Sequence, residues 1–138
     1  MRVMSLDLGE KRTGVAVSDA TGTVSSPLDV LPTNEVMNNA ASFRKLLADY
    51  EVELLVVGLP ISLDGSEHTQ ATSIRSLVTR LEKLYSLPVE FIDERLSSKE
   101  AKRVLRQLGY SEKDMRGKTD KIAASIVLQT WLDNRQAL

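Results

Sequence analysis

Short aliphatic runs separated by polar turns open the chain and predict three consecutive strands. The first run surrounds residue 7 and the second covers residues 15–17 after a glycine-containing connection, so the two are expected to form a hairpin. A third strand is expected over residues 23–31, after an Asp-Ala-Thr-Gly turn at residues 19–22. Pro27 favours an edge position for this strand, because proline lacks the N–H group that a central strand needs.

Helical spacing and aliphatic runs alternate in the rest of the chain. A helix is expected from Thr33 or Asn34 to about Tyr50, and a nearly all-aliphatic strand follows over residues 53–58. Because this strand is apolar on both sides, it should lie centrally and run parallel to the first strand. The remaining expected elements are a helix over residues 68–85, a strand over 88–93, a helix from a capping box at 97–100 to residue 108, and a last helix over 119–134 that packs Ile122, Ala123, Ile126 and Val127.

The order of these elements, β-β-β-α-β-α-β-α-α, is that of the ribonuclease H-like fold. In this α/β fold a five-stranded mixed sheet, whose first three strands are antiparallel, is flanked by helices. A single domain over residues 1–138 is expected, since this length suits one hydrophobic core. Open α/β sheets place their sites at the carboxyl ends of parallel strands, so the loops after residues 8, 58 and 93 should converge.

Composition narrows both the class of protein and its chemistry. Apolar residues make up 42% of the chain and charged residues 27%, as is typical of a globular protein. The chain has no cysteine, which excludes disulfides, thiolate zinc sites and cysteine nucleophiles. It shows neither a basic and apolar leader nor an apolar run of about 18 residues, so a cytoplasmic protein is expected.

Charge is distributed unevenly along the chain, although the net charge is only −1. Residues 19–72 carry eight acids and two bases, whereas residues 95–121 carry four acids and nine bases. Such a basic stretch is either a solvated helix face or a surface for nucleic-acid phosphates, which Lys and Arg neutralise. The candidate phosphate contacts are Lys99, Lys102, Arg103, Arg106, Arg116 and Lys118.

Four acidic residues stand where the expected elements begin or end. Asp7 places a carboxylate in an otherwise aliphatic strand, so it should either accept N–H groups of the following turn or meet a cation. Asp93 and Glu94 end the fifth strand, and only one of them should face the site because side chains alternate across a strand. Asp120 opens the last helix, where the helix dipole alone also favours an acid.

A cation is required if these acids approach one another as the fold predicts, because their charges repel. Oxygen ligands in a chain with no cysteine and a single histidine select Mg²⁺ or Mn²⁺ over zinc or copper. Two such ions about 4 Å apart would activate water and stabilise the leaving oxygen of a phosphodiester. The sequence therefore predicts a metal-dependent nuclease with a two-metal mechanism.

Four motifs carry a resemblance that covers essentially the whole chain. They read Leu-Asp-Leu-Gly at residues 6–9 with Thr-Gly-Val-Ala-Val-Ser-Asp at 13–19, Val-Gly-Leu-Pro at 57–60 with Asp-Gly at 64–65, Asp-Glu-Arg-Leu-Ser at 93–97, and Lys-Thr-Asp-Lys-Ile-Ala-Ala at 118–124. With these motifs the chain resembles the YqgF/RuvX family of ribonuclease H-like Holliday junction resolvases. The resemblance implies metal-dependent cleavage of nucleic acid, either resolving four-way DNA junctions or maturing the 5′ end of pre-16S ribosomal RNA. It implies Asp7, Glu94 and Asp120 as the catalytic and metal-binding acids, with Asp93 as a further candidate.

The fourth strand lacks an acid that the wider superfamily carries. RuvC-type nucleases carry an acid on the fourth strand. In this protein the fourth strand ends in Gly58-Leu59-Pro60, so acids of the fifth strand would have to substitute.

Two other functions fit part of the sequence pattern. A non-catalytic module that binds RNA or the ribosome would keep the same fold. A nucleotide-binding protein related to actin, Hsp70 and sugar kinases shares the Asp-x-Gly hairpin, but those proteins enclose ATP between two such domains. The expected partner is a four-way DNA junction or precursor rRNA, without a membrane, and the expected state is a monomer or a homodimer.

Overall fold

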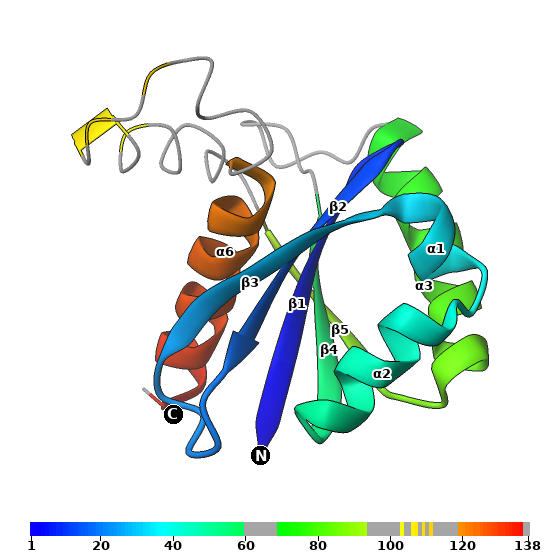
Figure 1. The fold of residues 1–138 in the computed structure, drawn as a ribbon, viewed down its shortest axis with the longest axis horizontal. Helices are drawn as coiled ribbons and strands as arrows, with labels where there is room; N and C mark the ends of the chain where they lie inside the picture. Colours follow the sequence, from blue (N-terminus) through cyan, green and yellow to red (C-terminus); the bar gives the residue numbers. More distant parts are fainter. Residues whose placement is uncertain are drawn as a thin grey trace.

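The computed structural model describes residues 1–59, 69–93, 103, 106–107, 109, 111 and 119–136. Five strands of these residues form one mixed sheet, and helices lie on both of its faces (Figure 1). The strands are β1 (Arg2–Leu8), β2 (Arg12–Ser18), β3 (Ser25–Pro32), β4 (Val52–Leu59) and β5 (Val89–Asp93). The helices are α1 (Thr33–Met37), α2 (Ala41–Asp49), α3 (Thr69–Tyr85) and α6 (Thr119–Gln136).

The strand order β3-β2-β1-β4-β5 places β1 at the centre of the sheet. β1 pairs antiparallel with β2 and parallel with β4, β2 pairs antiparallel with β3, and β4 pairs parallel with β5. The three opening antiparallel strands and the parallel, central position of β4 are therefore confirmed. Pro27 lies on β3 at the edge of the sheet, as expected, and this strand begins at Ser25, two residues later than predicted.

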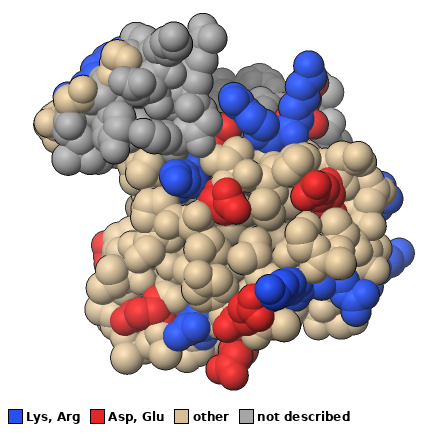
Figure 2. All heavy atoms as spheres, viewed as in Figure 1, with Lys and Arg blue, Asp and Glu red and all other residues tan. Residues whose placement is uncertain are grey.

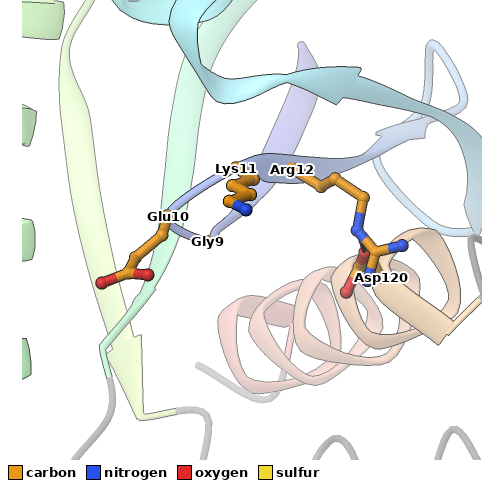
Figure 3. A pocket seen from close by; sticks show the side chains of 5 residues that line it. All are labelled: Gly9, Glu10, Lys11, Arg12 and Asp120. Carbon is orange, nitrogen blue, oxygen red and sulfur yellow. Dashed lines mark ion pairs between the residues drawn. The ribbon is translucent and has the colours of Figure 1, made fainter.

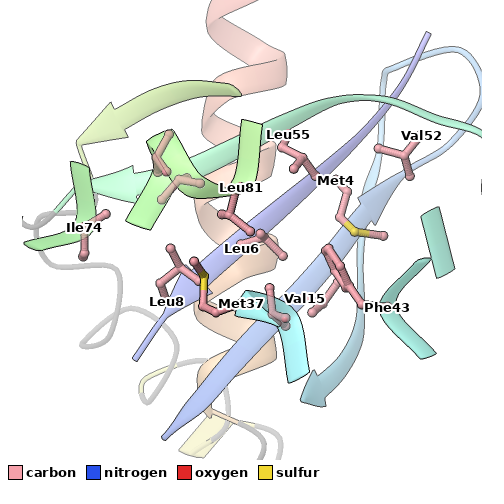
Figure 4. Close-up of a cluster of buried hydrophobic side chains, with 13 residues drawn as sticks. Met4, Leu6, Leu8, Val15, Met37, Phe43, Val52, Leu55, Ile74 and Leu81 are labelled. Carbon is pink, nitrogen blue, oxygen red and sulfur yellow. The ribbon is translucent and has the colours of Figure 1, made fainter. Parts of the chain in front are cut away.

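Alternate residues of β1 face two different helical layers. Met4, Leu6 and Leu8 belong to the core that β1, β2 and β4 share with α1, α2 and α3 (Figure 4). Val3 packs in a second cluster with residues of α6, and the Ser5 hydroxyl donates to the backbone of the same helix. α6 therefore covers the face of the sheet opposite to α1, α2 and α3, and odd-numbered residues of β1 point toward it.

The helix predicted from residue 33 or 34 to residue 50 is wrong, because the chain forms two short helices there. α1 ends at Met37, and the side-chain amide of the next residue, Asn38, donates to the Asn34 carbonyl at 2.8 Å. Asn39 follows with φ of 59°, a left-handed conformation that asparagine tolerates better than most residues. The predicted side-chain cap is also absent from α1, since Pro32 precedes the helix and no side chain caps it. α2, which follows the break, buries Phe43 in the core that it shares with the sheet.

The buried face of α6 differs slightly from the predicted one. Ala123 and Val127 are buried as predicted, and the helix also buries Ala124, Leu128 and Leu132 in the second core cluster. Ile122 and Ile126 are only partly buried. Two of the four predicted residues are therefore buried, and the two isoleucines are partly exposed.

Of the other predicted elements, some are confirmed and some lie outside the described residues. α3, β5 and α6 agree with the expected ranges to within two residues. The loop at residues 61–67 and most of the helix predicted over residues 97–108 lie outside the described residues, although residues 103, 106 and 107 have helical backbone. Among the helices that the structure describes, none combines the length and the apolar character needed to span a membrane.

A carboxylate stabilises the turn between β2 and β3. Asp19 accepts hydrogen bonds from the Thr21 hydroxyl at 2.6 Å and from the N–H groups of Thr23 and Val24 at 2.7 and 3.1 Å. These bonds favour the charged form, the Thr21 bond most strongly, and lower the pKa of Asp19 from 3.8 to about 2.

This pKa shift predicts how the free energy of unfolding depends on pH. Because the folded-state pKa lies below the unfolded value, the stabilisation is present well above pH 3.8 and is lost as the pH falls toward 2. Asp19→Asn should therefore be less stable than wild type at pH 6, with a difference that shrinks between pH 4 and pH 2. Urea denaturation at several pH values measures it, and a difference independent of pH would contradict this role of the carboxylate.

Candidate active site

Asp7 lies on the face of the sheet that α6 covers. The hydroxyl of Ser5, two residues earlier on β1, donates to the Ala124 carbonyl of α6 at 2.6 Å. Asp7 points to the same side as Ser5 and is partly buried. In the β1–β2 register it lies opposite Gly14. Its carboxylate therefore stands beside the strand position that contacts the beginning of α6.

Gly14 allows the first turn of α6 to touch the backbone of β2. A Cβ atom on Gly14 would lie 2.0 Å from the carbonyl oxygen of Asp120 and 2.8 Å from the backbone nitrogen of Lys121. No side chain fits in that space, so glycine is required by close backbone approach. Since Asp7 is the cross-strand neighbour of Gly14, this contact brings Asp7 and Asp120 to the same corner of the molecule.

Asp120 is paired with a cation from the β1–β2 turn. The Nε atom of Arg12 lies 3.3 Å from Oδ2 of Asp120, and the two side chains are 58% and 27% exposed (Figure 3). The Oδ2 atom is inaccessible to solvent and accepts no hydrogen bond from the described part of the chain. The ion pair therefore supplies charge neutralisation without an aligned hydrogen bond, and the oxygen retains capacity for another ligand.

A pocket of about 460 Å³ opens between this turn and the start of α6. Gly9, Glu10, Lys11, Arg12 and Asp120 line it. Figure 3 shows the Arg12 side chain reaching toward Asp120, whereas the Glu10 side chain points away from that pair. The pocket thus combines one site carboxylate with two cationic side chains on a single turn.

The buried hydroxyl groups of Thr13 and Thr33 help to hold the β1–β2 turn in its conformation. The Gly9 N–H donates to the Arg12 carbonyl at 2.9 Å, so it is not available to cap Asp7 as one interpretation of the sequence expected. The Thr33 hydroxyl donates to the Gly9 carbonyl at 2.8 Å, and the Thr33 N–H donates to the Lys11 carbonyl at 2.9 Å. Because the single Thr33 proton is used there, the hydroxyl of Thr13 must be the donor in the 2.8 Å bond between the two threonines.

Replacing Thr33 with Val should test this support. The isosteric change leaves the buried Thr13 hydroxyl and the Gly9 carbonyl without their partner, which should lower the free energy of unfolding by about 1–3 kcal/mol. Thr130→Val is the matched control, because Thr130 is exposed and bonds only within α6. Chemical denaturation compares them, and equal stabilities of the two variants would contradict the anchoring role.

The other predicted site residues are only partly visible. Asp93 is the last residue of β5 and lies opposite Leu59 of β4, and its side chain is outside the described set. Arg103 and Arg106 are exposed on helical backbone. The following predicted residues lie outside the described residues: Glu94, Lys99, Lys102, Arg116 and Lys118. Within the described ranges no group of three acidic or histidine side chains is placed to hold a metal ion.

The sequence interpretation gave no individual role at this corner to Lys11, Arg12, Gly14 or Thr33. A signal existed for Gly14, since an isolated glycine inside a strand pattern indicates close approach by another backbone. No comparable local signal marks Arg12, because its partner on α6 is remote in the sequence.

The five-stranded mixed sheet with helices on both faces is the α/β fold of the ribonuclease H-like class. RuvC from T. thermophilus, solved in complex with a Holliday junction substrate, is similar with a TM-score of 0.58 and 18% identity, over 99% of this chain and 96% of that one. Fowlpox virus resolvase, solved with Holliday junction DNA, has a TM-score of 0.61 and 12% identity, over 98% and 99% of the two chains. At these identities the likeness concerns the fold, and it confirms the predicted fold class.

The chain belongs to the RuvX family, described as Holliday junction resolvase, whose model matches residues 1–134. A relative from Anaeromyxobacter sp. (strain Fw109-5), named "Putative pre-16S rRNA nuclease", is 41% identical over 137 residues, which are 99% of this chain and 100% of the relative. A relative of the same name from Roseiflexus sp. (strain RS-1) is 39% identical over 98% of this chain and 96% of its own. The predicted family and the predicted nuclease class are confirmed. The site residues remain predictions.

Proposed function

We propose that this protein is a divalent-metal-dependent endonuclease that cleaves structured nucleic acid at the corner between β1 and the start of α6. The observation that supports this proposal is the backbone contact at Gly14, which brings the backbone of Asp120 against the β2 position that pairs with Asp7. α6 begins at the end of the sheet where β1 and β4 finish (Figure 1). Ligand sites of open α/β sheets lie at that end of the parallel strands.

The residues present fit a hard divalent ion. The Oδ2 atom of Asp120 is buried and accepts no hydrogen bond within the described residues, so it is a carboxylate oxygen with a free lone pair. Asp7, Asp120 and Glu94 would hold Mg²⁺ or Mn²⁺, with Asp93 as the alternative ligand from the end of β5. When bound, the metal supplies a polarised water and stabilises the leaving oxygen, and a pair of ions would do both at once.

The chain's own cations would bind and orient the substrate backbone. Lys11 and Arg12 line the pocket next to Asp120. Lys and Arg side chains also project from the upper edge of the described part of the molecule in Figure 2, the end at which α6 begins. The candidate contacts of the basic stretch would extend this surface: Lys99, Lys102, Arg103, Arg106, Arg116 and Lys118. Because phosphate contacts fix position without reading sequence, such a surface suits recognition by shape.

The first candidate substrate is the 5′ end of pre-16S rRNA, in the cytoplasm. Relatives that are 39–41% identical over nearly their whole length carry names with this substrate. The second candidate is a four-way DNA junction, which the description of the family favours. A junction has twofold symmetry and would call for a homodimer, whereas trimming one RNA end requires only a monomer.

A cleavage assay with both substrates tests this function. Labelled precursor rRNA ends and labelled four-way junctions are each incubated with the protein in Mg²⁺, in Mn²⁺ or in EDTA, with an unstructured strand of equal length as the control. Metal-dependent cleavage of the precursor at a defined position is expected. Cleavage of the junction alone, with a doubled solution mass on junction binding, would favour the second substrate. Binding without cleavage of either would overturn the catalytic proposal in favour of a binding module.

A further inference from the structure

Arg12 competes directly with a metal ion for the same carboxylate. Its Nε atom lies 3.3 Å from Oδ2 of Asp120, the oxygen that is otherwise available as a ligand. A guanidinium and a divalent cation cannot both neutralise this buried oxygen at close range, because their charges repel each other. Among the described residues, Arg12 is the cation that lies beside this oxygen.

The Arg12 side chain can leave Asp120 while its backbone stays fixed. Its carbonyl accepts the Gly9 N–H at 2.9 Å, and the residue pairs with Pro32 of β3. The side chain itself is 58% exposed and borders the pocket of about 460 Å³. Because the Arg12 side of this ion pair is exposed, the pair contributes little stability and a stronger anion can displace Asp120 from the guanidinium.

A phosphodiester is the anion that the guanidinium binds best. Its planar fork donates two parallel hydrogen bonds to two phosphate oxygens, whereas here it meets Asp120 without an aligned bond. We infer that Arg12 neutralises Asp120 in the free protein and moves to a substrate phosphate on binding, which frees Asp120 for the metal ion. Metal and phosphodiester should then each raise the other's affinity, since such coupling is reciprocal. This inference rests on the proposed function.

Mn²⁺ binding measured by electron paramagnetic resonance tests the inference without any measurement of cleavage. The proteins are wild type, Arg12→Gln and Lys11→Gln, and the last is the matched control because it removes the same charge from the same turn. Removing the competitor should tighten Mn²⁺ binding about fivefold or more in Arg12→Gln and clearly less in Lys11→Gln. Dimethyl phosphate, a minimal phosphodiester, should tighten Mn²⁺ binding by wild type relative to chloride of equal ionic strength, and should have no such effect on Arg12→Gln.

The outcomes separate this inference from the proposed function. If wild type binds Mn²⁺ but both variants change its affinity equally, or dimethyl phosphate has no effect on wild type, the inference alone is overturned. If wild type binds no Mn²⁺, both are overturned. Arg12→Lys keeps the charge without the planar fork, and it should bind Mn²⁺ like wild type while losing most of the effect of dimethyl phosphate. Circular dichroism melting confirms that each variant is folded, as the exposure of Arg12 predicts.

Discussion

Asp7→Asn should slow cleavage by about 1,000-fold or more and leave the fold intact. The carboxylate is the one charged group of β1 on the face toward α6, beside the contact between Gly14 and Asp120. Asparagine keeps the size of the side chain and removes the charge that a divalent cation requires. A bound metal stabilises the transition state by several kcal/mol. Because about 1.4 kcal/mol corresponds to a factor of ten in rate, its loss amounts to at least three orders of magnitude.

Single-turnover cleavage of the precursor rRNA end measures this effect, with Mn²⁺ binding as a second readout. Asp49→Asn is the matched control, because Asp49 is an exposed acid at the end of α2, far from the carboxyl end of β1. It should cleave at the wild-type rate. Cleavage by Asp7→Asn within a factor of ten of wild type would remove this residue from the site, whatever the substrate.

Gly14→Ala should cause the largest loss of stability among the variants considered, and it should reduce activity as well. The new methyl group would lie 2.0 Å from the carbonyl oxygen of Asp120 and 2.3 Å from its carbonyl carbon. These are backbone atoms, which cannot move aside as a flexible side chain would. α6 must therefore shift away from β2, and the cost should be about 3 kcal/mol or more, at the upper end of overpacking effects. A displacement of about 1 Å at Asp120 would also slow cleavage by about 100-fold.

Gly22→Ala separates this effect from the general cost of replacing glycine. Gly22 has φ of 72°, and among the described residues a Cβ atom there would meet only the Met1 carbonyl oxygen, at 3.5 Å, so alanine costs backbone strain of about 1–2 kcal/mol. It lies in the turn between β2 and β3, away from the site. Thermal and urea denaturation should rank Gly14→Ala below Gly22→Ala, and only Gly14→Ala should lose activity below its melting temperature. Equal losses of stability without loss of activity would contradict the close contact with α6.

Local sequence patterns predicted most of the sheet and less of the helices. The aliphatic run of β4 indicated a strand buried on both faces, and Pro27 indicated an edge strand, because each property depends on the residues themselves. The break between α1 and α2 was missed, since apolar residues at helical spacing continue across it, whereas the left-handed backbone of Asn39 and the extended backbone of Ala40 interrupt the helix. On α6 the predicted Ala123 and Val127 are buried, whereas Ile122 is only partly buried, because the rotation of the helix on the sheet depends on tertiary packing.

Local sequence patterns were sufficient to predict the fold class, the family and the acidic residues that are candidates for the site. Alternation along strands, turn residues and unusual carboxylates are properties of neighbouring positions, so they can be recognised without a structure. Only the tertiary structure decided which groups meet at the corner. The Ser5–Ala124 bond joins residues 119 positions apart, and the Gly14 contact and the Arg12–Asp120 pair likewise join the hairpin to the last helix. Such contacts depend on how α6 crosses the sheet, which no local pattern specifies.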